Sequence, residues 1–117
     1  MVAERPMGEP SKQHKASPIY QDVSKIKKQI DMLYGRIQKD AKFSPSRNNL
    51  DEIADQIIHI CNIYHETIMP WDKHLKAAII DLTEVPIIMG PEMQRFAFAT
   101  ALKDASESLN QFLSGNW

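Results

Sequence analysis

A polar stripe on the segment 49–71 holds the residues of this sequence that are best spaced for chemistry. Its members recur every three or four positions, which places them on one face of a helix: Glu52, Asp55, His59, Asn62 and Glu66. Two carboxylates one helical turn apart are oxygen ligands of the kind that Mg²⁺ prefers. The stripe therefore predicts either a metal-binding face through Glu52 and Asp55 or the solvated face of an amphipathic helix.

The run Glu52-Ile-Ala-Asp55-Gln-Ile-Ile-His59-Ile is similar to the second acidic motif of the all-α nucleotide pyrophosphohydrolases, the MazG-like and phosphoribosyl-ATP pyrophosphatase families. This resemblance covers nine residues of 117. It implies that Glu52 and Asp55 help to hold Mg²⁺ against substrate phosphates. Those families supply further carboxylates from an E-x-x-E/D cluster on an earlier helix, and this sequence has no such cluster there. A degenerate pyrophosphohydrolase is therefore one alternative.

The remaining reactive residue types form no recognised catalytic pattern. His65-Glu66 would need a histidine at position 69 to make a zinc-protease motif, and Met69 is there. Cys61 is the only cysteine and falls on the apolar side of its predicted helix, where a thiol packs as a small hydrophobic group. No glycine-rich loop is available to cradle phosphate. We therefore predict no catalytic residue, no cofactor and no enzyme activity.

Charge is distributed unevenly along the chain, although the net charge is only −1. Residues 1–49 carry ten basic and five acidic residues, whereas residues 50–117 carry four basic and ten acidic ones. Lys25, Lys28 and Lys39 fall on the outer face of the first predicted helix. They predict a contact surface for nucleic acid, for an acidic protein, or for the acidic half of the same chain.

Hydrophobic periodicity predicts four helices and no strand. Their expected ranges are 18–42, 49–69, 71–82 and 91–114. Ser17 before Pro18 is a helix start with an N-cap and a proline at the first helical position. Asn49 with Glu52 predicts a capping box. Gly115 is the expected end of the last helix.

The first predicted helix carries a seam of hydrophobic residues spaced 4, 3, 4, 3 and 4 positions apart. Its members are Ile19, Val23, Ile26, Ile30, Leu33 and Ile37. Such a seam serves as the contact stripe of a bundle helix or as the interface of a coiled-coil homodimer. We favour the bundle, because the later helices need partners for their own apolar faces.

Two further features predict a surface for a partner. Val85, Ile87 and Ile88 belong to an apolar connection that we expect to cover an open end of the bundle or to contact a partner. Trp117 follows the last helix and either folds back on the core or anchors a partner. The aromatic residues at helical spacing are instead expected in the core: Trp71, Phe96, Phe98 and Phe112.

These patterns together predict an all-α protein, a small four-helix bundle over residues 17–117 that follows a disordered N-terminal tail over residues 1–16. No stretch is apolar enough to span a membrane and no signal peptide is recognisable, so we expect a cytoplasmic location. The expected function is to bind a protein partner, as an adaptor, inhibitor, immunity or chaperone-like protein. Nucleic-acid binding through the first helix and degenerate pyrophosphohydrolase activity remain as alternatives.

Overall fold

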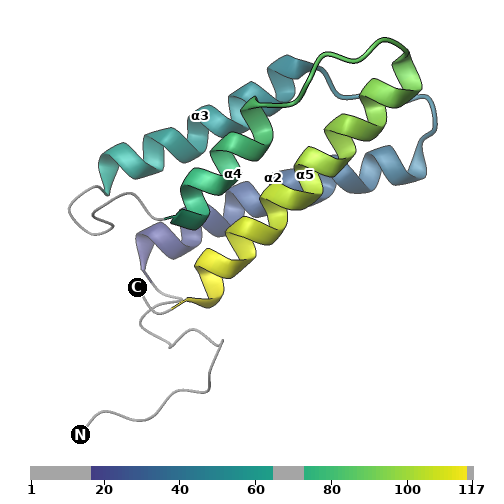
Figure 1. Cartoon of the computed structure of the whole chain (residues 1–117). Helices are drawn as coiled ribbons and strands as arrows, with labels where there is room; N and C mark the ends of the chain where they lie inside the picture. The colour runs from purple at the N-terminus through teal and green to yellow at the C-terminus, as the bar shows by residue number, and fades with distance from the viewer. Residues whose placement is uncertain (1–16, 65–72, 116–117) are drawn as a thin grey trace, which may run out of the picture.

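The computed structural model describes residues 17–64 and 73–115 and confirms the all-α prediction. Its four helices are α2 (Pro18–Lys39), α3 (Arg47–Ile63), α4 (Lys73–Thr83) and α5 (Pro91–Ser114). Consecutive helices lie side by side in opposite directions, and α5 also packs on α2 to complete the bundle (Figure 1). No strand occurs among the described residues. The predicted tail over 1–16 lies outside them, as do Trp71 and Trp117.

Side-chain caps account for where α2 and α3 begin. Ser17 Oγ accepts a hydrogen bond from the Tyr20 amide at 3.2 Å, and Pro18 occupies the first turn, as predicted. Helix α3 begins earlier than predicted, because its N-cap is Ser46. Ser46 Oγ accepts from the Asn49 amide at 3.3 Å, and Asn49 Oδ1 accepts from the Ser46 amide at 2.8 Å. Asn49 is therefore the inner member of a capping box and not its first residue.

The ends of α2 and α3 and the start of α5 differ in part from the predicted boundaries or depend on a special residue. Helix α2 stops at Lys39, three residues before the predicted end, and the Asp40 carboxylate accepts from the Lys42 amide at 3.0 Å. Helix α3 ends at Ile63, and the remainder of its predicted range from residue 65 on lies outside the described residues. Gly90 precedes α5 with a φ of 108°, a backbone conformation that glycine adopts without a steric penalty.

The hydrophobic seam of α2 lies in the core of a single chain. Five of its six members are buried, and Leu33 is half-buried against them. The facing helices contribute fully buried side chains to the same core: Leu50, Ile57, Cys61, Leu75, Leu82, Leu102, Leu109 and Phe112. The seam is therefore used within one chain, and a homodimer through it stays a prediction.

One aromatic residue departs from its predicted place. Phe98 and Phe112 are buried as expected, but the Phe96 side chain is 71% exposed. A helix turns by about 100° per residue, so Phe96 and Phe98 face different sides. Of the helices described, none combines the length and the apolar character that crossing a membrane requires.

Candidate protein-interaction surface

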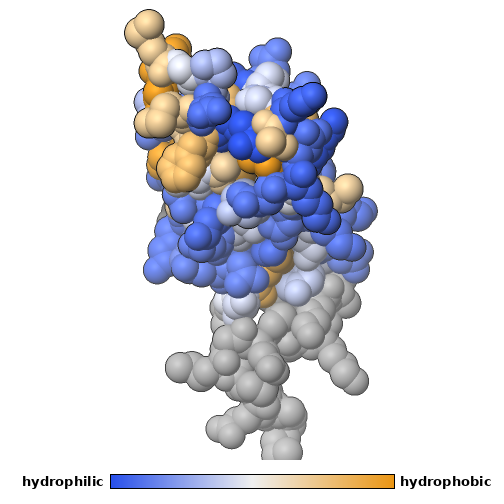
Figure 2. Space-filling model, turned by 90° about the vertical axis from the view of Figure 1, so that its right-hand side faces the viewer, coloured by the Kyte–Doolittle hydropathy of each residue, from blue (hydrophilic) through white to orange (hydrophobic). Residues whose placement is uncertain are grey.

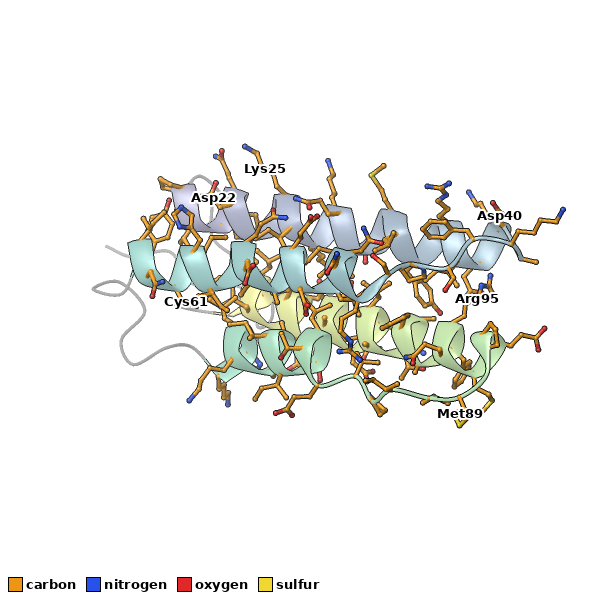
Figure 3. All side chains as sticks on the ribbon, turned by 90° about the horizontal axis from the view of Figure 1, so that it is seen from above. Asp22, Lys25, Asp40, Cys61, Met89 and Arg95 are labelled. Carbon is orange, nitrogen blue, oxygen red and sulfur yellow. The ribbon has the colours of Figure 1, made fainter. Side chains whose placement is uncertain are left out.

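One end of the bundle, formed by the α4–α5 connection and the first turns of α5, carries four large hydrophobic side chains that remain exposed. Their exposed fractions are 88% for Ile87, 95% for Met89, 61% for Met93 and 71% for Phe96. Figure 2 shows hydrophobic side chains gathered on this end of the molecule, and Figure 3 shows Met89 pointing away from the bundle. We call these four residues the apolar end.

Gln94 holds the α4–α5 connection against α5. Its side-chain amide donates to the Pro86 carbonyl at 3.1 Å, and its amide oxygen accepts from the Ile88 backbone N–H at 2.8 Å. Both backbone groups belong to an extended segment, so neither has a hydrogen-bond partner within a helix or a strand. The backbone that carries Ile87 is therefore fixed on both sides, and its side chain projects outward from an ordered segment.

Arg47 fixes the start of the same connection from α3. Its guanidinium donates to the Val85 carbonyl at 2.6 Å and lies 6.0 Å from the centre of the Phe98 ring. Val85 itself is buried and belongs to the core. The prediction that it lies on a partner surface is therefore wrong. Ile88 is half-buried, and Ile87 is the member of the predicted trio that is fully available to a partner.

Arg95 ties the end of α2 to this region. Its Nε donates to the Phe43 carbonyl at 2.8 Å, and its Nη2 donates to the carbonyls of Asp40, at 3.0 Å, and Ile37. The last carbonyls of a helix lack partners within the helix, so Arg95 supplies donors that α2 cannot. Figure 3 shows Arg95 beside Asp40, at the same end of the molecule as Met89. No local pattern marks such a cap, because its partners lie 52 to 58 positions away in the sequence.

The three predicted lysines are exposed on α2, but they do not form one patch. Lys25, Lys28 and Lys39 make no ion pair within residues 17–64 and 73–115. Lys39 follows Lys28 by eleven positions, which is about 16 Å along a helix. Lys39 instead lines a groove between α2 and α5 together with Phe96, so it borders the apolar end.

Glu52 and Asp55, the metal ligands that the pyrophosphohydrolase alternative implies, are exposed on α3. No group of three or more acidic, histidine or cysteine side chains suited to a metal ion occurs in the part of the chain that the structure describes. The two aspartates of α2 and Asp40, which follows it, are engaged with other groups: Asp22 with the Tyr64 hydroxyl, Asp31 with Lys27 and Asp40 with the Lys42 amide. The described residues thus bring no third carboxylate to Glu52 and Asp55, and the pyrophosphohydrolase alternative stays a prediction.

Among residues 17–64 and 73–115, two titratable groups have clearly shifted pKa values, and neither belongs to the apolar end. Burial raises the pKa of the Asp81 carboxyl, the charge of Asp104 raises it further, and the Ser108 hydroxyl, which donates to it at 3.4 Å, lowers it. Burial also raises the pKa of the Tyr64 hydroxyl, as do its hydrogen bond to Asp22 and the charge of that carboxylate. Both shifts accompany contacts between helices.

Comparison with known proteins gives no match to a family model, to a curated protein or to a solved structure. Over residues 17–64 and 73–115 the protein is a four-helix bundle with an exposed apolar end.

Proposed function

We propose that this protein is a non-enzymatic interaction protein that binds another protein through the apolar end. The observation that supports this is the exposure of Ile87, Met89, Met93 and Phe96 on one end of the molecule. An aromatic side chain such as Phe96 offers about 150–250 Å² of surface. Isoleucine and methionine offer less each, and the four exposed side chains together present an apolar patch. Exposed apolar patches of this kind are typical of protein-interaction sites.

Hydrogen bonds that hold the backbone of the apolar end in place favour tight binding. Gln94 and Arg47 already hold the connection in place, so a partner would order little additional backbone when it binds. Methionine side chains adapt to irregular apolar surfaces, which suits Met89 and Met93 to this role. The partner we expect is a protein that presents an apolar patch of matching size.

The test is a double substitution, Met89→Glu with Phe96→Glu, in the full-length chain. Two buried glutamates without partners would oppose the association, so capture of the dominant protein partner from extract of the native cell should fall at least tenfold. Immobilised wild-type and variant proteins are compared by quantitative mass spectrometry. Circular dichroism confirms that the variant keeps its helices, which we expect because both side chains are exposed.

The control is Ile80→Glu, which introduces one glutamate at a 47% exposed hydrophobic residue of α4, and it is compared with the double variant and with each of its single substitutions. Its capture of the partner should equal that of the wild type. The proposal fails if the wild type captures no dominant protein, or if the control loses the partner as fully as the double variant does.

Nucleic-acid binding has weaker support. Lys25 and Lys28 are exposed and unpaired within the described residues, as phosphate contacts require. However, Glu52 on the neighbouring helix lines a groove beside α2, and its charge would repel a phosphate backbone lying there.

A further inference from the structure

A groove runs between α2 and α3. It consists of two hollows of about 380 and 330 Å³, and both are lined by Gln29 and Gln56. The side-chain amides of these two residues bond reciprocally across the groove, at 2.9 and 3.1 Å. Along α2 the lining extends from Asp22 to Arg36, which corresponds to about 21 Å of helix.

The floor of the groove is apolar, and three of its side chains are only 4–5% exposed: Ile26, Ile53 and Ile60. Ile26 and Leu33 of α2 and Ile53 and Ile60 of α3 line it, and all four also contribute to the hydrophobic core. Two large hydrophobic side chains that line it are unusually open to solvent: Met32 is 75% exposed and Ile63 is 56% exposed. A partner that covered them would bury apolar surface that the bundle itself leaves in water.

The walls of the groove carry charges of both signs, and Lys25, Arg36 and Glu52 make no ion pair among the described residues. Lys25 and Arg36 line it from α2, with Asp22 at one end, and Glu52 lines it from α3. The Arg36 guanidinium also lies 4.0 Å from the centre of the Phe43 ring. Within the described residues no ion pair joins α2 to α3, since the pair there, Lys27 with Asp31, lies within α2. The groove therefore offers a basic wall and an acidic wall, on either side of an apolar floor.

We propose that this groove binds an amphipathic helix of a protein partner, with acidic residues on the flank that faces α2 and basic residues on the flank that faces α3. About four turns of helix match its length, and an apolar stripe laid into an apolar groove is a common mode of helix recognition. Both charged walls would then be paired. A duplex nucleic acid would satisfy only the basic wall, would leave Met32 and Ile63 uncovered and would face Glu52. This site goes beyond the proposed function, because none of its residues belongs to the apolar end.

The test uses three synthetic 18-residue helix-forming peptides and the full-length protein. The first has a leucine stripe with glutamates on one flank and lysines on the other. The second has the same stripe with lysines on both flanks, and the third has the composition of the first with its leucines dispersed. Fluorescence anisotropy of labelled peptides at physiological salt should show that the first binds at least tenfold more tightly than the other two.

Charge reversal of the basic wall, Lys25→Glu with Arg36→Glu, gives the sharper prediction. It should weaken binding of the first peptide at least tenfold and strengthen binding of the all-lysine-flank peptide, because both walls are then acidic. Lys76→Glu with Lys103→Glu reverses two exposed lysines on α4 and α5 and should change neither affinity. Met32→Glu should weaken the first peptide, whereas Phe96→Glu should not, which separates this site from the apolar end.

Three results would overturn the proposal. One is equal binding of the dispersed-leucine peptide and the first peptide. Another is that the protein binds no peptide but binds a 20-base-pair DNA duplex, and that the Lys25→Glu, Arg36→Glu variant no longer binds this duplex. The third is self-association, seen by light scattering, that Met32→Glu abolishes, because the groove would then be occupied by a second copy of the chain.

Discussion

Two arginine side chains, together with Gln94, make the polar contacts that hold the chain at the apolar end. Arg47 reaches from α3 to the Val85 carbonyl, and Arg95 reaches from α5 to three carbonyls at and beyond the end of α2. A guanidinium carries five N–H donors in a planar fork, so one side chain can bond several carbonyls at once. Neither contact follows from local sequence, because each joins residues that are at least 38 positions apart.

Arg95→Ala should lower the free energy of unfolding by about 1–3 kcal/mol, because it leaves carbonyls at the end of α2 without their donors. Urea unfolding followed by circular dichroism measures the change. Lys103→Ala, at an exposed position of the same helix, should stay within about 0.5 kcal/mol of the wild type. Equal stability of Arg95→Ala and the wild type would mean that water replaces the arginine at no cost.

Asp81→Asn should raise the free energy of unfolding at about pH 7 and leave it unchanged at about pH 3. The folded state raises the pKa of Asp81, chiefly through burial and then through Asp104. The native protein therefore holds this proton more strongly than the unfolded chain, and the stability due to Asp81 is complete at low pH and is lost as pH rises through the folded-state pKa. Asparagine stays neutral at both pH values and still accepts from Ser108.

Urea unfolding of wild type and Asp81→Asn at the two pH values gives this comparison. Glu107→Gln, which removes an exposed carboxylate from α5, should show no stabilisation that appears only at the higher pH. An Asp81→Asn protein that is no more stable than the wild type at about pH 7 would contradict the expected sign.

At the scale of helices, periodicity predicted the number, order and type of the elements, and the boundaries followed less closely. The seam predicts α2 clearly, because six hydrophobic residues at heptad spacing share one face of a helix and do not share one face of a strand. The start of α3 was misplaced because Ser46 and Asn49 both suit an N-cap, and only the three-dimensional turn shows which residue occupies it. Side-chain caps are local contacts, but the choice between adjacent caps depends on the path of the preceding loop.

Gly35→Ala should stabilise α2 and raise the free energy of unfolding by about 0.5–1 kcal/mol, because glycine within a helix costs conformational entropy. A Cβ atom at Gly35 would meet no atom within 4 Å. Gly90→Ala is the matched opposite, and it should destabilise by about 1 kcal/mol or more, because the φ of 108° at Gly90 is strained for alanine. Thermal and urea unfolding measure both, and a loss of stability in Gly35→Ala would show that this face of α2 is covered.

At the scale of the whole molecule, no ion pair joins the basic half to the acidic half in the part of the chain that the structure describes. The ion pair found among residues 17–64 and 73–115 joins Lys27 to Asp31, within the basic half. The exposed lysines of α2 therefore keep their charge available to other molecules. This is the physical basis on which the groove between α2 and α3 was assigned a partner helix with an acidic flank.

The sequence identified part of the candidate surfaces. Ile87 was predicted because an apolar connection between prolines is unusual, and Lys25 because it lies opposite a clear seam. Phe96 is predicted to lie in the core because its spacing from other aromatic residues indicates a buried helix face. Whether that face is exposed depends on the positions of the neighbouring helices. The groove depends on the spacing between α2 and α3. Neither is encoded in the periodicity of one segment.

The long reach of the arginine contacts has a consequence for the order of folding. Contacts between residues distant in sequence require the closure of large loops, and they tend to form after local pairs of helices have met. The carbonyls bonded by Arg95 lie 52 to 58 positions away, whereas α4 and α5 are joined by a short connection. We therefore expect the apolar end to be completed late, so that loss of Arg95 accelerates unfolding more than it slows folding.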